Sequence, residues 1–160
     1  GEAGWKGVVD RRTGGRRRVR VEGREEVGVG LNPALGIGQV EGGVSQGLGW
    51  LTTEERWWNK GGKLMTHAPS TYKIPTVNDT PPEFNVKLFN NRNVEDSIHR
   101  SKAVGEPPLL LPFSVFFAVR DAVAAVGDYK VNPLLDAPAT GESILRAVSA
   151  VRAARAAQAV

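Results

Sequence analysis

Residues 83–89, with the sequence EFNVKLF, alternate strictly between polar and apolar side chains, and this stretch decides the fold class. Successive side chains of a strand point to opposite faces, so Phe84, Val86 and Leu88 would share one face. The polar run NNRN at residues 90–93 would end the strand. A sheet containing this strand has an apolar face that a second layer of structure must cover.

Residues 8–22 contain two further strand-like stretches on either side of a glycine pair at 14–15. Glycine permits positive φ, so this pair favours a tight turn and predicts a β-hairpin. Val19 and Val21 alternate with charged residues, which is typical of a strand with one solvated face. Residues 50–58 and 64–66 flank a turn at 60–63 and are compatible with a second hairpin.

A glycine-rich helix is predicted after Asn32, which can act as an N-cap with Pro33 in the first turn. Fourteen of the 19 glycines precede residue 50, and each interior glycine costs a helix about 1 kcal/mol relative to alanine. This helix would therefore need tertiary contacts. In return, its glycines would let the backbone approach a ligand or a neighbouring element closely.

Two more helices are predicted downstream. Pro107-Pro108 starts a helix to about Val126, and its apolar residues surround nearly the whole circumference, which predicts a buried helix. Thr140 can cap a final alanine-rich helix to about Ala157. The order of elements predicts an α+β fold: antiparallel strands with a glycine-rich helix, a buried helix and a C-terminal helix.

The composition limits the classes of function. Hydrophobic residues make up 41% of the 160-residue chain and charged residues 24%, which is typical of a packed domain. The absence of cysteine excludes a disulfide scaffold, a thiolate zinc site and a cysteine-ligated iron–sulfur cluster within this chain. His67 and His99 lack the spacing of metal ligands, so no protein-ligated metal is expected.

The net charge of +4 is local, because residues 1–30 hold eight Lys/Arg and five Asp/Glu. The triplet RRR at 16–18 could touch nucleic acid, but no aromatic ladder accompanies it. We interpret it as a solvated strand or turn and expect no nucleic-acid partner. No apolar run approaches the roughly 20 residues of a membrane span, and no signal pattern begins the chain. A soluble, cytoplasmic protein is expected.

Three segments carry chemical information. In GIGQVEG at 36–42, the glycine spacing fits neither the dinucleotide fingerprint nor a phosphate-binding loop. Gln39 and Gln46 lie seven apart and share a helix face, where amides could serve a heterocyclic ligand or could be ordinary surface residues. The segment APSTYKIP at 68–75 has two prolines that bracket a stiff, extended loop.

The third segment, SKAVGEPP at residues 101–108, places Glu106 between a glycine and two prolines. Gly105 allows an unusual backbone angle, and the prolines fix the chain direction and begin the predicted helix. A carboxylate in this position is either a helix N-cap or a general base.

Together these segments resemble the xanthine dehydrogenase family. NPAL (32–35), GQVEG (38–42), QGLG (46–49), PSTYKIP (69–75) and SKAVGEPPL (101–109) occur in this order in that family. Departures lie at Gly23-Arg24, Gly36 and Gly43. The resemblance implies the C-terminal part of the molybdenum-cofactor-binding large subunit. Residues 1–160 would then be a segment of the larger molybdopterin-binding domain, with a weakly matching hairpin (1–26), a core cofactor-site segment (27–126) and a C-terminal extension (127–160).

The resemblance also implies an activity, the oxidation of hypoxanthine and xanthine to urate. In the family a pterin holds molybdenum, the glutamate matching Glu106 takes the proton of the metal-bound hydroxide, and hydride passes to a sulfido ligand. Gln39 matches a residue that contacts the cofactor. Ala103, Val104 and Gly105 would bring their backbone near it.

The implied partners are a purine, the rest of the large subunit and an FAD/iron–sulfur subunit, in a hetero-oligomer with a dimeric core. FAD and 2Fe–2S would lie outside this chain, so the fragment is expected to be inactive alone. Two alternatives stay open. One is an aldehyde oxidase-type hydroxylase, which shares the glutamate. The other is a non-catalytic remnant or interaction module with a basic N-terminal arm.

Overall fold

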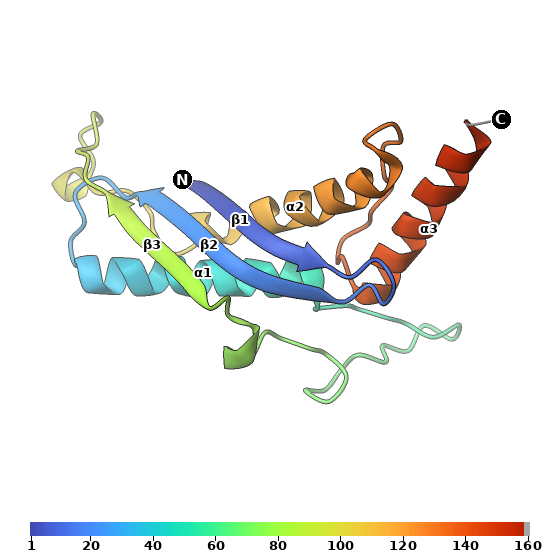
Figure 1. Ribbon diagram of the computed structural model, residues 1–160. Coiled ribbons are helices and arrows are strands. Elements are labelled where there is room, and N and C mark those ends of the chain that lie inside the picture. The colour runs from blue at the N-terminus through green and yellow to red at the C-terminus, as the bar shows by residue number, and fades with distance from the viewer. Residues whose placement is uncertain (159–160) are drawn as a thin grey trace.

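The computed structural model describes residues 1–158 and confirms the α+β class, with a small sheet lying against helices (Figure 1). The strands are β1 (Glu2–Val9), β2 (Arg16–Glu26) and β3 (Glu83–Phe89). The α-helices are α1 (Pro33–Thr52), α2 (Phe113–Ala124) and α3 (Gly141–Ala157). Four 3-10 helices complete the list: η1 (Val77–Asp79), η2 (Ile98–Arg100), η3 (Pro107–Leu110) and η4 (Ala125–Gly127).

The sheet has the order β1-β2-β3. The predicted hairpin is confirmed, because β1 and β2 pair antiparallel around a turn in which Asp10 N donates to Gly15 O at 2.7 Å. The expectation of antiparallel strands throughout is wrong for β2 and β3, which pair parallel. These two strands are joined by α1 and a long loop rather than by a tight turn, so the chain returns to the same end of the sheet. The second hairpin is reduced to a single bridge, Trp58 with Leu64.

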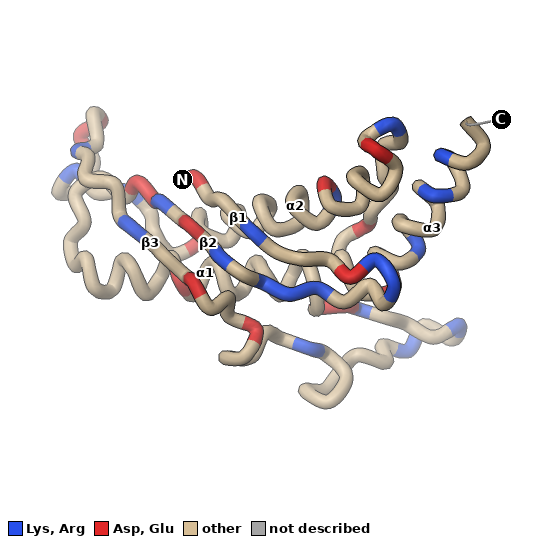
Figure 2. Tube along the Cα trace, in the orientation of Figure 1, with Lys and Arg blue, Asp and Glu red and all other residues tan. Residues whose placement is uncertain are grey.

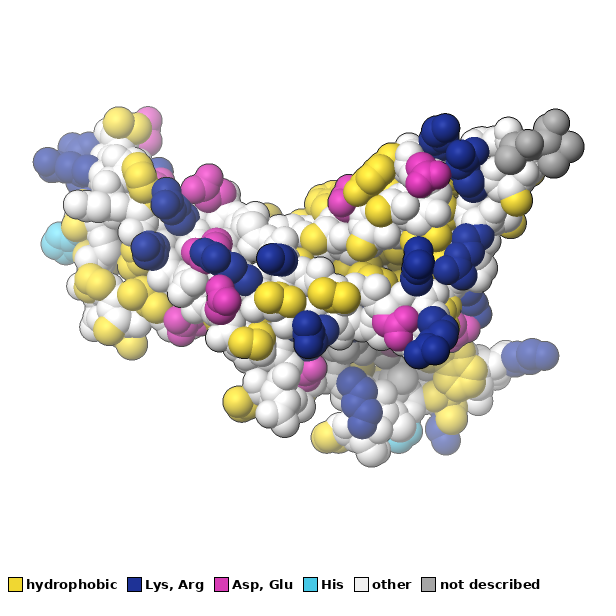
Figure 3. Space-filling view, in the orientation of Figure 1, with side chains coloured by type: hydrophobic (Ala, Val, Ile, Leu, Met, Phe, Trp, Pro, Cys, Tyr) yellow, Lys and Arg dark blue, Asp and Glu magenta, His cyan; other side chains and the backbone are white. Residues whose placement is uncertain are grey.

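The two faces of the sheet differ as the alternation in residues 83–89 predicts. Phe84, Val86 and Leu88 pack on a core cluster that includes Val40 and Val44 of α1. The opposite face carries charged side chains of both signs along β2 and β3 (Figures 2 and 3). Ion pairs link them, with Arg20 lying 2.6 Å from Glu22 and 3.6 Å from Glu83. Arg24, one of the departures from the family pattern, is exposed on this solvent-facing side of the sheet.

Helix α1 begins as predicted, with Asn32 Oδ1 accepting a hydrogen bond from Leu35 N at 3.2 Å. Its glycines then permit close contact with the chain at residues 107–112. A Cβ at Gly43 would lie 2.7 Å from Pro108 Cβ, and a Cβ at Gly47 would lie 2.4 Å from Leu109 O. No side chain fits in that space, so these two glycines set how closely the helix and the proline-rich segment pack.

The predicted continuous, buried helix from Pro107 to Val126 is corrected in two ways. The chain forms η3 first and becomes α-helical only at Phe113. Pro112 has no N–H to donate to Pro108 O, and Leu111 N makes that bond instead in 3-10 geometry at 3.1 Å. In addition, only one face of α2 is buried. Phe117 of α2 is 55% exposed, and Leu110 of the preceding η3 is 60% exposed.

By length and composition alone, the helical stretch Pro107–Gly127 is apolar enough to cross a membrane, although Arg120 and Asp121 interrupt its apolar run. This is weak evidence for a span, because core helices pass the same test. Val115, Val119 and Val123 of this stretch lie in the protein interior. Its apolar character is therefore explained in part by packing within the fold.

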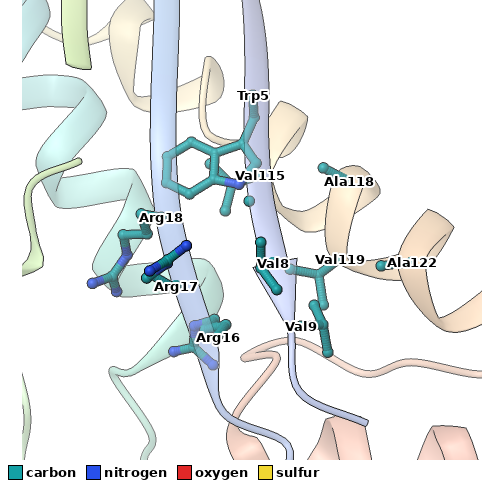
Figure 4. Close-up of a pocket in the computed structure, with 11 residues that line it drawn as sticks. Trp5, Val8, Val9, Arg16, Arg17, Arg18, Val115, Ala118, Val119 and Ala122 are labelled. Carbon is teal, nitrogen blue, oxygen red and sulfur yellow. The ribbon is translucent and has the colours of Figure 1, made fainter. Parts of the chain in front are cut away.

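A second core cluster joins α2 to α3 and includes Val119, Val123, Ile144 and Val148. The cap predicted for α3 is confirmed, since the Thr140 hydroxyl accepts a hydrogen bond from Ser143 N at 3.2 Å. Figure 4 shows how the hairpin covers α2. The side chains of Trp5, Val8 and Val9 from β1 lie beside Val115, Ala118, Val119 and Ala122 around a small cavity.

The arginine triplet at 16–18, interpreted from its sequence as a solvated strand or turn, begins strand β2 with Arg17 exposed, but Arg16 and Arg18 are partly buried. The guanidinium of Arg16 donates to Ala139 O at 2.5 Å and to Thr52 O at 2.8 Å, and burial lowers its pKa to about 10. Arg18 pairs with Asp79 at 2.7 Å. Arg16 and Arg18 therefore connect β2 to the ends of distant segments.

The glycine contacts of α1 predict opposite effects for two alanine substitutions. Gly47→Ala forces a methyl group onto the Leu109 carbonyl and should lower the free energy of unfolding by about 1–3 kcal/mol. Gly42→Ala is the matched control, because nothing lies within 4 Å of its Cβ position. It should raise stability by up to about 1 kcal/mol through helix propensity. Urea unfolding of the 160-residue chain measures both, and equal effects at the two sites would contradict the packing argument.

The ion pair between Arg18 and Asp79 predicts a dependence of stability on pH. The backbone N–H of Thr76 is the main group that holds the pKa of Asp79 below its ordinary 3.8, and Arg18 adds to it. A lowered pKa in the folded state gives stability that is complete above the unfolded value and is lost as pH falls through the folded value. Asp79→Asn should cost no more than about 1 kcal/mol near neutral pH, because the carboxylate is partly screened by water.

The same variant should also flatten the loss of stability below about pH 4. Unfolding measured between about pH 2 and pH 7 tests this, with the exposed Asp136→Asn as the control. Wild-type pH dependence in Asp79→Asn would show that this carboxylate contributes nothing to the acid response.

Candidate functional site

The segment that carries Glu106, residues 101–108, is attached at its N-terminal end to the residues that directly follow β2. Lys102 N donates to Val27 O at 2.8 Å, Ser101 bridges to Gly28, and the Lys102 ammonium pairs with the Glu26 carboxylate. The hydrogen bond that this ammonium donates is the main reason why the pKa of the Glu26 carboxyl group is lowered. The sequence did not reveal Glu26 as a positioning residue, because 76 positions separate it from Lys102 and no local pattern links them.

A tight crossing of two chain segments fixes this starting point. Gly28 has φ +65°, and a Cβ there would lie 2.3 Å from Arg100 O. His99 and Arg100 also have positive φ, at 53° and 58°, which is uncommon for residues other than glycine. Val29 N donates to Arg100 O at 2.9 Å across the crossing. The path from residue 99 to residue 102 is therefore closely determined.

Beyond Lys102 the chain meets α1, and the structure brings the first and third predicted segments together. Val104 is half-buried against the core cluster of the sheet and α1. Gly105 faces Gln39, whose side-chain oxygen lies 3.5 Å from the Cβ position of Gly105. Pro108 is buried, and Gly43 is its neighbour on α1. Of the predicted cofactor contacts, Ala103, Gly105 and Gln39 are exposed.

Glu106 lies at the N-cap position of η3, with φ −101° and ψ −38°, and it is exposed. Its side chain makes no capping hydrogen bond, and only its backbone oxygen joins the turn by accepting from Leu109 N at 3.0 Å. The structure thus removes the capping interpretation that the sequence left open. The carboxylate is not used by the local fold.

The exposed face of α1 beside this carboxylate is unusually free of side-chain bulk. Nothing lies within 4 Å of the Cβ positions of Gly38 and Gly42. Gln39 and Gln46 are exposed on the same side of the helix, as their spacing predicts. A flat organic group could reach the backbone here and meet amide groups that both donate and accept hydrogen bonds.

Within residues 1–158 no group of three or more His, Asp or Glu side chains could hold a metal ion. The glycine and amide face of α1 fits a flat organic group better than it fits a bare ion.

The second predicted segment lies elsewhere, at the C-terminal end of α1. A Cβ at Gly49 would lie 2.4 Å from Pro75 Cδ, and Tyr72 donates to Glu54 at 2.5 Å, which raises the pKa of Tyr72. Gly49 is ten residues from Gln39, or about 15 Å along the helix. The loop at 68–75 thus supports the far end of α1 and does not join Glu106.

Comparison with known proteins agrees with this arrangement. Residues 7–81 match the family described as the molybdopterin cofactor-binding domain. The chain is 46% identical over 145 residues to the xanthine dehydrogenase/oxidase of Mus musculus, covering 87% of this chain and 11% of that protein. It is 49% identical over 117 residues to the xanthine dehydrogenase of Dictyostelium discoideum, covering 73% and 9%.

Among solved structures, quinoline 2-oxidoreductase from Pseudomonas putida 86 superimposes with a TM-score of 0.78 at 27% identity, covering 88% of this chain and 17% of that one. The fold and the site therefore define a segment of a molybdopterin cofactor-binding domain. The chain belongs to the xanthine dehydrogenase family, which confirms the resemblance seen in the sequence. It spans only about a tenth of the length of these curated relatives.

The position of Gln39 beside Gly105 predicts a specific effect on cofactor content. Within a full-length large subunit, Gln39→Ala should lower the molybdenum-to-protein ratio several-fold, because it removes the amide next to the Glu106 segment. Gln158→Ala is the matched control, an exposed glutamine at the end of α3 and away from this helix face. Metal analysis of the purified subunits measures the ratio. Equal molybdenum content in the two variants would argue against a role for Gln39 in binding.

Proposed function

We propose that this chain forms one wall of the molybdenum–pterin site of a xanthine dehydrogenase-type hydroxylase, with Glu106 as the general base. One observation carries the proposal. The carboxylate of Glu106 has no capping role, and the segment that bears it packs next to Gln39 and the open glycine face of α1.

The molybdenum–pterin group, when bound, supplies the activated oxygen and accepts the electrons of the reaction. The role of this chain would be to hold and orient that group. Gly38 and Gly42 leave the α1 backbone open to close approach, and the Gln39 amide offers both a donor and an acceptor. Gly105, the last of residues 103–105, lies beside the Gln39 amide.

Glu106 would accept a proton at its carboxylate oxygen as the oxygen nucleophile attacks an electron-poor carbon of the substrate. This task requires a fixed carboxylate. Gly105 beside Gln39 and buried Pro108 against Gly43 hold the chain on both sides of Glu106, and proline restricts the backbone further. The geometry therefore favours a positioned base over a mobile surface residue.

The remaining parts of the proposed enzyme lie outside this chain. Its relatives named xanthine dehydrogenase are roughly eight times longer, since the matched 145 and 117 residues make up 11% and 9% of them. We propose hypoxanthine and xanthine as substrates. The proposed partners are the rest of the large subunit and an FAD/iron–sulfur subunit, in a cytoplasmic hetero-oligomer. On this proposal the 160 residues alone do not turn over.

Glu106→Gln tests the function directly. In the assembled enzyme this variant should keep its molybdenum content and lose about 10²- to 10⁴-fold in the rate of xanthine hydroxylation, because an amide cannot accept the proton. Stopped-flow reduction of the enzyme by xanthine, hypoxanthine and an aromatic aldehyde measures the rate and the substrate class.

Glu95→Gln, an exposed glutamate in the loop after β3, is the matched control and should behave like wild type. Near-normal turnover of Glu106→Gln would remove this residue from the mechanism. Faster oxidation of the aldehyde than of either purine by the unmodified enzyme would point to an aldehyde oxidase-type hydroxylase.

A further inference from the structure

A group of aromatic and aliphatic side chains on the outer surface of α1, η3 and α2 takes no part in the core. This aromatic patch consists of Trp50, Leu110, Phe113 and Phe117. Trp50 and Phe113 meet edge to face with centroids 5.7 Å apart, and Phe113 stacks on Phe117 at 6.2 Å. Although the rings contact one another, Trp50 is still 46% exposed.

The patch is connected to the core and is held in one shape. Phe117 contacts Phe116 at 5.9 Å, and Phe116 packs against the cluster that joins α2 to α3. The patch residues themselves carry no charge. Exposed apolar groups of this kind mark interaction sites, and aromatic residues are enriched at the centres of interfaces. Exposure to water does not explain why three aromatic rings contact one another on the surface, with Leu110 exposed on the neighbouring η3.

The patch is continuous with the site of Glu106. Residues 105–113 run alongside α1 in the same direction, as shown by successive contacts of Gly105 with Gln39, Pro108 with Gly43, and Phe113 with Trp50. Gln39, Gln46 and Trp50 lie on one stripe of α1, because seven and eleven residues are close to whole turns. The carboxylate thus lies at one end of this surface and the rings at the other, about 16 Å apart along the helix.

We propose that the aromatic patch is the docking surface for an apolar, uncharged face of the remaining large subunit, and that this docking also covers Glu106. The inference rests on the proposed function. About nine tenths of the length of the curated relatives lies outside this chain, so a covering element of the same polypeptide is available. Continuity with the proposed cofactor face favours that element over a second copy of this chain.

The first test measures exposure in the assembled enzyme. Hydroxyl-radical labelling is compared between the native and the urea-unfolded enzyme, so no isolated fragment is needed. Trp50, Phe113 and Phe117 should be labelled at least tenfold less in the native enzyme. Half-exposed rings, as they are on this chain alone, would show only about a twofold reduction, and such a result would overturn the proposal.

The second test uses matched substitutions. Phe117→Ser should reduce the yield of assembled, molybdenum-containing enzyme at least tenfold, and Phe117→Leu should restore most of it because an apolar side chain suffices. Phe89→Ser is the control, since Phe89 is 54% exposed at the end of β3, outside the patch. Equal yields for Phe117→Ser and Phe89→Ser would contradict the proposal.

A photo-crosslinking phenylalanine analogue at position 117 identifies the occupant. Cross-links mapped by mass spectrometry to the same large subunit would support the proposal, and cross-links to position 117 or its surroundings in a second copy would overturn it. The proposed function is judged separately. If Glu106→Gln abolishes hydroxylation while the patch stays labelled, the docking surface is wrong and the catalytic assignment stands.

Discussion

The close packing of α1 against residues 107–112 positions everything that concerns the site. At Gly43 and Gly47 the helix backbone meets Pro108, Leu109 and Pro112 at distances that exclude even a methyl group. Because the two segments run in the same direction, this contact fixes which residues become neighbours along its whole length. Gly105 faces Gln39 before it, and Phe113 meets Trp50 after it. Glycines weaken α1 as an isolated helix, but they allow this close contact. The contact sets the position of the Glu106 segment relative to the exposed glycine face of α1.

The sheet supplies the second constraint. Its inner face covers the sides of α1 and α2, and the end of β2 fixes the chain at Lys102, four residues before Glu106. The path from Gly28 and Arg100 through the half-buried Val104 leaves little freedom for the segment between them. Glu106 is therefore exposed on a backbone that is held on both sides, as its proposed role of general base requires.

Much of the fold followed from local patterns. The alternation at 83–89, the glycine pair at 14–15, the Asn32 cap and the Thr140 cap each predicted an element that the structure contains. Two features could not be predicted. The parallel pairing of β2 with β3 depends on how the chain returns over α1, which no local pattern encodes. An apolar composition predicts a buried helix after Pro107, but it does not say which face of the helix packs against other elements. Within the described chain, one face of α2 packs against no other element and is exposed.

By itself the sequence determined the residue types of the site and the family to which they belong, because the order of several short motifs is specific to that family. The sequence could not decide whether Glu106 caps a helix, because the Gly-Glu-Pro-Pro sequence is compatible with a helix N-cap and with a general base. Tertiary structure decided this by leaving the carboxylate without a capping bond and by bringing Gln39, 66 positions before Gly105, next to that glycine. The reason is that side-chain availability and long-range neighbours depend on packing between distant segments, here on two glycines and two prolines that permit the contact.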